Sequence, residues 1–370
     1  MGGAGGGRLG KRGTSATLAT VTGPPLVQAF HSDRVDIIGD VHGEIDALHA
    51  LLARLGCDVA RCTVERPIIF VGDLVDRGPD SVAVVLLVQQ LVEAGVAQMV
   101  LGNHELNLLT LDQKEGNGWF LRREAPDGWR DDHKAHVPFI SQPASDDDRE
   151  RIASFLRSLP VALESPELRV VHAAWSSPAI EAARQAPNLD AFMKPLPVDF
   201  PPLALDGAPT HEELSNPEAH VPFHADLAAK QVAEQNSQPI KVVTSGLERP
   251  IAAGTTPRWL SGKWRLLERD PWWEHEDDDR SVVFGHYWRR RPSAKVDGKP
   301  DPFDAIPPTA WFGNRGQAFC IDYSVGYRIK ARHAGQNPHT NYGLAALRWP
   351  ERALVFDDEE VSVPTTRTRH

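Results

Sequence analysis

The chain has 370 residues, of which 41% are hydrophobic and 24% charged, so it is long enough to bury a large core. Its formal net charge of −10 argues against a nucleic-acid strand as a partner, because binding to a phosphate backbone needs a concentrated positive face. No stretch reaches the roughly 18 apolar residues of a membrane helix, and three cysteines suit a reducing compartment, so we expect a cytoplasmic protein without a membrane partner.

The chain opens with a segment rich in Gly, Ser and Thr that has no apolar core of a signal peptide, and we expect a disordered tail over residues 1–34. Apolar runs then alternate with helical spacing of apolar residues. The pattern predicts strands and helices in the order strand 35–40, helix 44–56, strand 66–73, helix 79–95 and strand 97–102. Such a series implies parallel strands with right-handed crossovers.

The second half of the domain, which we place at 35–355, is less regular. A helix over 145–160 is capped by Ser145. Further apolar runs predict strands at 168–175, 240–246, 281–287, 317–324 and 342–349. Residues 176–238 are rich in Pro and polar residues and are interpreted as a long insertion or cap, and 356–370 as an acidic mobile tail.

Charged or imidazole side chains follow five of these predicted strands. In parallel sheets the functional groups gather beyond the carboxyl ends of the strands. Each segment alone is weak, since Gly-Asp is often only a turn and a lone His is usually a packed residue. Together, in order, they predict one site built from residues 39–43, 72–78, 102–105, 171–173 and 285–286.

The side chains in these segments are those that a pair of metal ions requires. Two divalent cations about 3.5–4 Å apart need a bridging carboxylate with oxygen and imidazole ligands on each side. Asp73 would be the bridge, and the mixed N/O donors favour Mn²⁺, with Fe or Zn²⁺ as alternatives, over Ca²⁺. The candidate metal ligands are Asp40, His42, Asp73, Asn103, His172 and His286.

The motifs G-D-x-H-G, G-D-x-V-D-R-G and G-N-H-E, with the two later histidines, resemble those of the PPP-type metallophosphoesterases. This superfamily includes Ser/Thr protein phosphatases, the lambda phosphatase group and symmetrical diadenosine tetraphosphatases. The match runs from about Val35 to Tyr323. It implies an α/β fold, the four-layer α/β/β/α calcineurin-like sandwich, with a dinuclear metal site at the strand C-terminal ends; the residues alone predict only the parallel first half.

The resemblance also implies the roles of the remaining side chains. His104 would be the general acid that protonates the leaving group, with Asp76 orienting its imidazole. Arg77 would hold the phosphate oxygens as a planar fork, and Asn103 would contact the substrate as well as metal. A hydroxide between the two metals would attack phosphorus in line, without a phosphoenzyme.

The resemblance further implies a second phosphate-binding arginine between the two late histidines. We favour Arg269 over Arg249, and either could be an ordinary surface residue. Asp322 lacks the Thr-Gly that usually follows it, so no role is assigned to it. Trp272 and Trp273 are candidates for a wall of the substrate cleft, with core packing at least as good an interpretation.

The function indicated is a metal-dependent phosphatase acting on phosphomonoesters, with phosphoserine and phosphothreonine proteins as candidate substrates. The preference rests on Glu105, since G-N-H-E rather than G-N-H-D favours protein phosphatases. The alternative is hydrolysis of a dinucleoside tetraphosphate or another nucleotide. A binding scaffold with a dead site is disfavoured by the intact ligand set.

Overall fold

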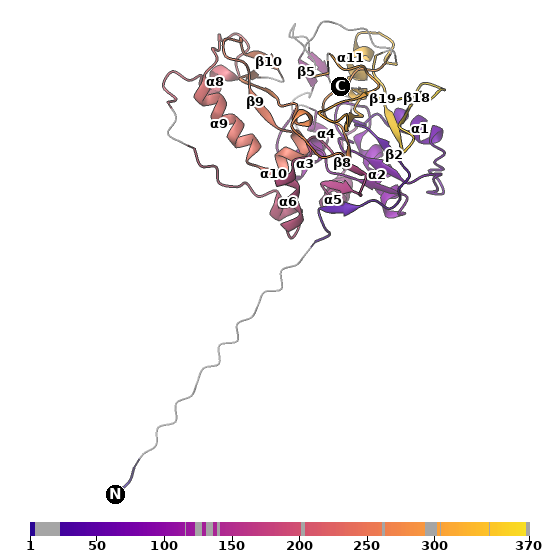
Figure 1. Cartoon of the computed structure of the whole chain (residues 1–370), viewed down its shortest axis with the longest axis horizontal. Coiled ribbons are helices and arrows are strands. Elements are labelled where there is room, and N and C mark those ends of the chain that lie inside the picture. Colours follow the sequence, from indigo (N-terminus) through magenta and orange to yellow (C-terminus); the bar gives the residue numbers. More distant parts are fainter. Residues whose placement is uncertain are drawn as a thin grey trace.

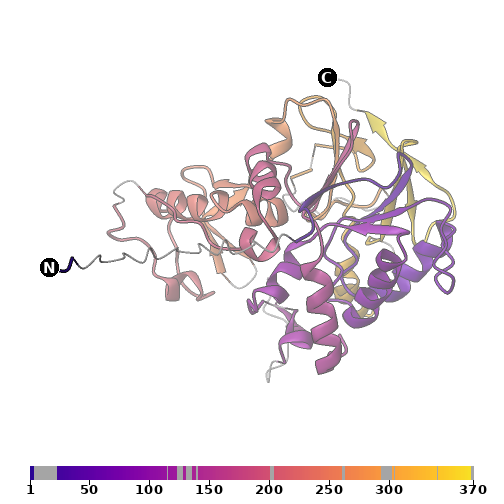
Figure 2. The same ribbon diagram turned by 90° about the horizontal axis from the view of Figure 1, so that it is seen from below.

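The computed structural model describes residues 1–3, 23–114, 116–122, 128–130, 136–138, 141–200, 204–260, 263–292, 302–303, 305–339 and 341–367. Two β-sheets lie at its centre, and a smaller lobe projects from one side (Figures 1 and 2). Within the described part of the chain, no helix combines the length and the apolar character needed to cross a lipid bilayer.

The first sheet has the order β18-β17-β16-β2-β3-β4. Its strands are β2 (Val35–Ile38), β3 (Ile68–Phe70), β4 (Ala97–Met99), β16 (Ala345–Trp349), β17 (Ala353–Phe356) and β18 (Val363–Pro364). β2, β3 and β4 are parallel, as the sequence predicted, and β16 runs antiparallel to β2.

The second sheet has the order β1-β7-β8-β13-β15. Its strands are β1 (Val27–Ala29), β7 (Ala162–Glu164), β8 (Leu168–Val171), β13 (Ser281–Phe284) and β15 (Ala318–Cys320). β8, β13 and β15 are parallel to one another. The carboxyl ends of β8 and β13 therefore lie side by side, and this brings the two late histidines together.

The core shows how the two sheets stack. Successive side chains of a strand point to opposite faces, and here both faces are buried. One face of each sheet contributes to an apolar cluster between the sheets, which includes Ile37, Ile69, Val71, Val170 and Val283. The other face contributes to a cluster shared with the helices, which includes Ile38, Phe70, Val171 and Phe284. This double burial explains the near-continuous apolar runs in the sequence.

Helices cover the outer faces of the sheets (Figure 2). They are α1 (Ile45–Arg54), α2 (Ser81–Glu93), α3 (Asn103–Leu109), α4 (Gly118–Leu121), α5 (Asp146–Arg157), α6 (Ser177–Gln185), α7 (Leu189–Phe192) and α10 (Pro239–Ser245). Ser145 caps α5 by accepting a hydrogen bond from Asp148 N, as predicted.

The strand predicted at 240–246 is wrong, because this segment is the helix α10. A short apolar run does not distinguish a strand from a buried helix. Pro239 occupies the first turn, where its missing N–H costs nothing, and Gly246 follows the last turn with φ +84. The helix packs against α6 and α3.

The lobe contains α8 (His211–Leu214), α9 (Ala225–Asn236), β9 (Glu248–Pro250), β10 (Arg258–Leu260), β11 (Lys263–Arg265) and β12 (Leu267–Arg269). It has its own small apolar cluster around Val221, Ala228 and Leu266. It differs in extent from the predicted 176–238 insertion: α6 and α7 pack on the sandwich core, and the lobe continues to β12.

The ends of the chain also differ from expectation. Residues 4–22 of the predicted 1–34 tail lie outside the described residues. The tail also contains the strand β1, which pairs with β7 of the second sheet. In the predicted 356–370 tail, β18 pairs with β17, and β19 (Thr366–Arg367) pairs with β14 (Ala310–Trp311).

The remaining elements are the hairpin strands β5 (Gly128–Arg130) and β6 (His136–Pro138), the 3-10 turns η1 (Trp272–Glu274) and η2 (Val325–Tyr327), and α11 (Arg328–His333). Trp272 and Trp273 are 3% and 1% exposed, so these two side chains pack in the core and do not wall a cleft.

Candidate metal centre

The turns after β2, β3, β4, β8 and β13 meet at one end of the sandwich, and their backbone is unusual. His42, Asp73, Asp76, Arg77 and His286 all have positive φ, at 47, 52, 71, 70 and 69°. Positive φ is uncommon for residues other than glycine, and each case costs of order 1–3 kcal/mol. The surrounding structure therefore holds five site residues in a left-handed conformation that aims their side chains at one point.

Close packing between the turns holds these residues in the left-handed conformation. A Cβ on Gly285 would lie 2.0 Å from Asp40 Oδ1, and a Cβ on Gly102 would lie 2.4 Å from Asp73 Oδ1. Both carboxylates therefore lie directly on the backbone of a neighbouring strand end. The glycines before His286 and Asn103 are required by this approach.

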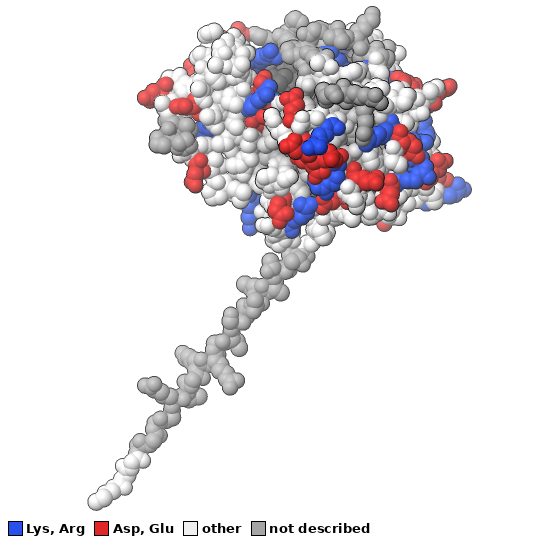
Figure 3. Space-filling model, viewed as in Figure 1, with Lys and Arg blue, Asp and Glu red and all other residues white. Residues whose placement is uncertain are grey.

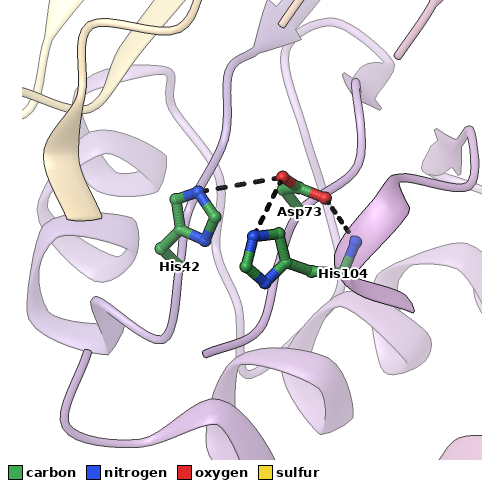
Figure 4. A group of neighbouring side chains, drawn as sticks. All are labelled: His42, Asp73 and His104. Atoms are coloured by element: carbon green, nitrogen blue, oxygen red, sulfur yellow. Dashed lines mark hydrogen bonds and ion pairs between the residues drawn. The ribbon is translucent and has the colours of Figure 1, made fainter. Parts of the chain in front are cut away.

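One group of possible metal ligands consists of His42, Asp73 and His104 (Figure 4). The Nε2 atoms of both histidines lie 3.8 Å from Asp73 Oδ2. His42 and Asp73 come from the turns after β2 and β3, and His104 comes from the first turn of α3, which follows β4. The potential ligand atoms of this group lie within 4.8 Å of one another.

A second group consists of Asp73, His172 and His286. His172 Nε2 lies 3.3 Å from Asp73 Oδ1 and 3.2 Å from Asn103 Oδ1. Asp73 thus presents one carboxylate oxygen to each group. This is the arrangement expected of a carboxylate between two metal ions.

Asp40 completes the ligand set that the sequence predicted. Its Oδ2 lies 3.9 Å from His42 Nε2 and accepts a hydrogen bond from His286 N at 3.1 Å. Asp40 is 2% exposed and Asp73 is also 2% exposed. All six predicted ligands are therefore brought together, and all but the partly exposed Asn103 are buried.

Backbone carbonyls orient the rings of two of the candidate ligands, His42 and His172. His42 Nδ1 lies 2.9 Å from Val75 O, and His172 Nδ1 lies 2.8 Å from Val71 O. A ring nitrogen that faces a carbonyl carries the proton, so the Nε2 atom of each ring, which faces Asp73, is the one with a lone pair to offer a metal ion when the ring is neutral.

Burial and neighbouring charges shift the titration of these groups. Burial raises the pKa of Asp40 well above its ordinary value, and nearby Asp322 adds to this effect. Burial, with the positive charge of Arg77, lowers the pKa of His42 well below 6.5. Burial opposes charging of His172, but the Asp73 carboxylate raises the pKa of that imidazole to about 10.

The residues fit a pair of divalent cations. Several carboxylates are buried here, and buried negative charge is costly unless cations compensate it. A bound divalent ion would be the largest local charge and would hold the carboxylates ionised and the imidazoles neutral. Oxygen and imidazole donors suit Mn²⁺, Fe and Zn²⁺.

His104 is held by a chain of hydrogen bonds. Its Nδ1 lies 2.5 Å from Asp76 Oδ2, and Trp119 Nε1 donates to Asp76 Oδ1 at 2.6 Å. Asp76 is fully buried and Trp119 is 5% exposed. The predicted His104–Asp76 contact is present, whereas Trp119 carried no signal in the sequence because it belongs to no motif.

The guanidinium of Arg77 contacts the rings of both His42 and His104. Its Nη1 is 2.6 Å from His42 Nε2, and its Nη2 is 3.2 Å from His104 Nε2. Arg269 reaches the same centre from the lobe, because its Nη1 donates to His286 O at 2.9 Å. Arg249 instead pairs with Glu268 at 3.0 Å, with both side chains about half exposed. Of the two candidate arginines, only Arg269 contacts a predicted site residue in the described structure.

Glu105 is a structural part of the site. Its Oε2 accepts hydrogen bonds from Asp73 N at 2.8 Å and Gly102 N at 3.0 Å, and its Oε1 accepts one from Leu74 N at 2.7 Å. The side chain is fully buried. Glu105 therefore fixes the turn that carries Asp73, a role that the sequence analysis did not identify.

Comparisons with known proteins agree with this geometry. The family model described as calcineurin-like phosphoesterase matches residues 33–199. A symmetrical bis(5'-nucleosyl)-tetraphosphatase from Janthinobacterium sp. (strain Marseille) is 30% identical over 261 residues, which are 68% of this chain and 81% of that protein. The chain belongs to the calcineurin-like phosphoesterase family. This confirms both the resemblance stated from the motifs and the fold that it implied, and the family implies divalent metal ions.

Other relatives match over less of their length. The asymmetrical bis(5'-nucleosyl)-tetraphosphatase PrpE of Oceanobacillus iheyensis is 48% identical over 75 residues, 19% of this chain and 30% of that protein. The chain thus spans about 30% of the length of such relatives. A protein serine/threonine phosphatase structure from Saccharomyces cerevisiae aligns with a TM-score of 0.43 and 13% identity, covering 93% of this chain and 84% of that chain.

Proposed function

We propose that this chain is a metal-dependent phosphoesterase that cleaves bis(5'-nucleosyl) tetraphosphates symmetrically, into two nucleoside diphosphates. A relative that matches over 81% of its own length carries the name of this activity. The asymmetrical relatives match only over a short segment. The proposed substrate is thus a small, highly charged dinucleotide, and the bond cleaved is the phosphoanhydride in the middle of its phosphate chain.

The observation that carries this proposal is a row of cations leading away from the metal centre. Arg269 of β12 contacts the carbonyl of His286, and Arg265 and Lys263 lie on β11, the strand that precedes β12 in the chain. Side chains two residues apart in a strand share a face. Figure 3 shows basic side chains over β9 and β10, the strands of the lobe that pair with β12 and β11. A phosphomonoester on a protein needs one phosphate clamp, whereas a tetraphosphate needs several positive groups in line.

The cations of this row lie close enough to affect one another. Burial lowers the pKa of Arg265, and the positive charge of Arg269 adds to the shift, while Glu248 opposes it. Burial, together with the positive charges of Arg265 and Lys114, lowers the pKa of Lys263. Positive groups held together in this way are stabilised by a polyanion.

The sequence-based preference for a phosphoprotein loses its basis. It depended on Glu105, whose carboxylate is occupied by three backbone N–H groups behind Asp73. Glu105 stabilises the packing of this turn, and its side chain does not lie where a substrate could contact it. Phosphoserine and phosphothreonine proteins therefore become the second candidate.

In the proposed reaction, water attacks a phosphorus atom in the middle of the chain and the bridging P–O bond breaks. Bound metal ions, for which Mn²⁺ is our first choice, would supply an activated water and neutralise charge on the phosphate. Arg77 would hold the non-bridging oxygens. His104, oriented by Asp76, would give its Nε2 proton to the departing nucleoside diphosphate.

The proposal places the enzyme in the cytoplasm, where nucleotides are abundant. The three free thiols of Cys57, Cys62 and Cys320 suit that reducing compartment.

The test compares substrates on one metal-stripped and Mn²⁺-reloaded sample. We expect kcat/KM for diadenosine tetraphosphate to exceed that for a phosphothreonine peptide by at least about 100-fold, with ADP as the sole product. A larger kcat/KM on the peptide would favour the second candidate. ATP with AMP as products would refute symmetrical cleavage, and no metal-dependent turnover of either substrate would refute the proposal as a whole.

A further inference from the structure

Three aromatic side chains lie beside the phosphate clamp and have no role in the reaction described above. Trp288, Tyr327 and Tyr342 are each half-buried. The core tryptophans Trp273 and Trp311 are by contrast at most 1% exposed. Large aromatic rings that remain partly accessible next to a catalytic centre are typical of ligand sites.

The ring of Trp288 directly contacts Arg77, the residue proposed to hold the phosphate. The guanidinium carbon of Arg77 lies 5.0 Å from the centre of the Trp288 ring, within the range of a cation–π contact. Arg77 also contacts His42 and His104. A group bonded to a phosphate held by Arg77 would therefore lie next to the Trp288 ring.

The second ring is brought to the same place by the turn η2. Gly326 packs so closely on the site that a Cβ there would lie 2.8 Å from His42 Cδ2 and 3.0 Å from Arg77 Cδ. Tyr327 follows immediately, and its ring meets that of Trp288 edge-to-face at 4.8 Å. Tyr342 stacks on Tyr327 at 5.5 Å, and Lys330 Nζ lies 5.0 Å from the Tyr327 ring.

One buried carboxylate holds both aromatic segments. Asp322 Oδ2 accepts a hydrogen bond from Trp288 N at 2.9 Å, and its Oδ1 accepts one from Ser324 N at 2.8 Å. Trp288 and Ser324 both have positive φ, at 56 and 63°. Asp322, to which the sequence analysis assigned no role, thus fixes two strained turns so that the rings converge. Strain of this kind is found where side chains must be aimed.

We propose that Trp288 and Tyr327 form a nucleobase-binding surface beside Arg77, with Asp322 as its positioning residue. The inference rests on the proposed function, because it takes a nucleotide as the substrate. A base stacks on an aromatic ring whatever its identity, since every base has a π-face. The surface would bind the base of the nucleotide whose phosphate Arg77 holds.

The test measures binding directly, by isothermal titration calorimetry of the Mn²⁺-loaded protein with AMP and with inorganic phosphate. We expect the Kd for AMP to be about 5- to 150-fold lower than that for phosphate, the range that stacking of one base provides. Trp288→Leu and Tyr327→Leu should remove most of this difference and change the Kd for phosphate by less than about twofold.

Two further variants control for the ring. Trp288→Phe keeps an aromatic face and should retain a preference for AMP. Trp259→Leu removes a tryptophan from the distal strand β10, where it contacts Trp264 at 5.7 Å, and should bind both probes as the wild type does. Equal affinities of the wild type for AMP and phosphate, or a preference that survives both leucine variants, would overturn the proposal.

A parallel loss of AMP and phosphate binding in Trp288→Leu would also overturn it, because the ring would then only support Arg77. The outcome is separable from the proposed function. Turnover of diadenosine tetraphosphate with no AMP preference refutes the nucleobase surface alone. An AMP preference that depends on Trp288, without such turnover, refutes the proposed reaction alone.

Discussion

The two sides of the candidate site are constructed differently. On one side, short turns after parallel strands carry the predicted metal ligands, with left-handed backbone at residues such as Asp73 and His286 and glycines packed against the carboxylates. On the other side, Arg269, Trp288 and Tyr327 reach the same centre from segments without a shared motif. The proposed chemistry thus depends on compact local geometry, whereas the residues proposed for recognition are spread over the chain. Substitutions on the first side should therefore affect every substrate, and those on the second should affect only particular ones.

The largest effect is expected at Asp73. Asp73→Asn removes charge from the carboxylate that presents one oxygen to each ligand group. We expect kcat to fall at least about 10³-fold on every phosphoester, because metal ions supply several kcal/mol of charge stabilisation. Bound metal, measured by elemental analysis after desalting, should fall by at least half. Asp112→Asn, a surface acid paired with Lys114, is the control. Full metal occupancy in Asp73→Asn would show that Asp73 is not the bridge.

His104 should separate chemistry from metal binding. His104→Asn removes the proposed proton donor and should lower kcat about 10²- to 10⁴-fold. Metal content should stay unchanged. Since His104 Nε2 also lies 3.8 Å from Asp73 Oδ2, loss of metal in this variant would instead assign His104 to the ligand set.

Trp119 tests the support behind His104. Trp119→Phe removes the hydrogen bond to Asp76 Oδ1 and leaves that oxygen buried without its donor. A hydrogen bond to a charged group contributes about 1.5–3 kcal/mol, so kcat should fall about 10-fold or more. The readout specific to positioning is the pH profile of kcat, whose limb for His104 should move. A fall in thermal stability with an unchanged pH profile would mean that Trp119 serves only packing.

The sequence predicted the first side of the site because its signals are local. Gly-Asp after an apolar run, repeated at parallel strand ends, brings side chains such as Asp40 and Asn103 together through sheet topology alone. Trp119 and Tyr327 could not be found in this way, since each reaches the site by tertiary packing. The same limit explains the wrong prediction for α10. Its apolar run is compatible with either a helix or a strand, and Pro239 in the first turn and packing on α6 favour the helix.

Arg269 addresses the second side of the comparison. Arg269→Gln removes a charge beside His286 and should raise KM for diadenosine tetraphosphate about 10-fold, with kcat changed less. For a simple phosphomonoester the increase should be smaller, because Arg77 remains. Arg249→Gln is the matched control, since its guanidinium pairs with Glu268 on the surface. Equal effects of the two variants would show that Arg269 has no special role.

The smallest effect is expected at Asp36, which lies near one end of β2, whereas Asp40 follows the other end. Asp40 lies among the proposed ligands, whereas Asp36 is fully buried and neither of its oxygens has a hydrogen-bond partner among the residues that the structure describes. Burial raises the pKa of Asp36 from 3.8 to about 6, although Arg348 at 3.5 Å opposes the shift. Between these two pKa values the folded state keeps a proton that the unfolded state has lost. Stability therefore falls as pH rises through this window and stays lower above pH 6.

Asp36→Asn removes this titration. A shift of about two pKa units corresponds to about 3 kcal/mol as an upper limit, and the unpaired amide of Asn offsets much of that gain. We expect the variant to be more stable than the wild type by about 1 kcal/mol at pH 7.5, or roughly 2 °C in Tm, with the difference vanishing near pH 4. Thermal unfolding at fixed metal concentration measures it. A difference independent of pH would mean that the Asp36 carboxylate is ionised in the folded protein, and that burial alone does not protonate a carboxylate in this sheet.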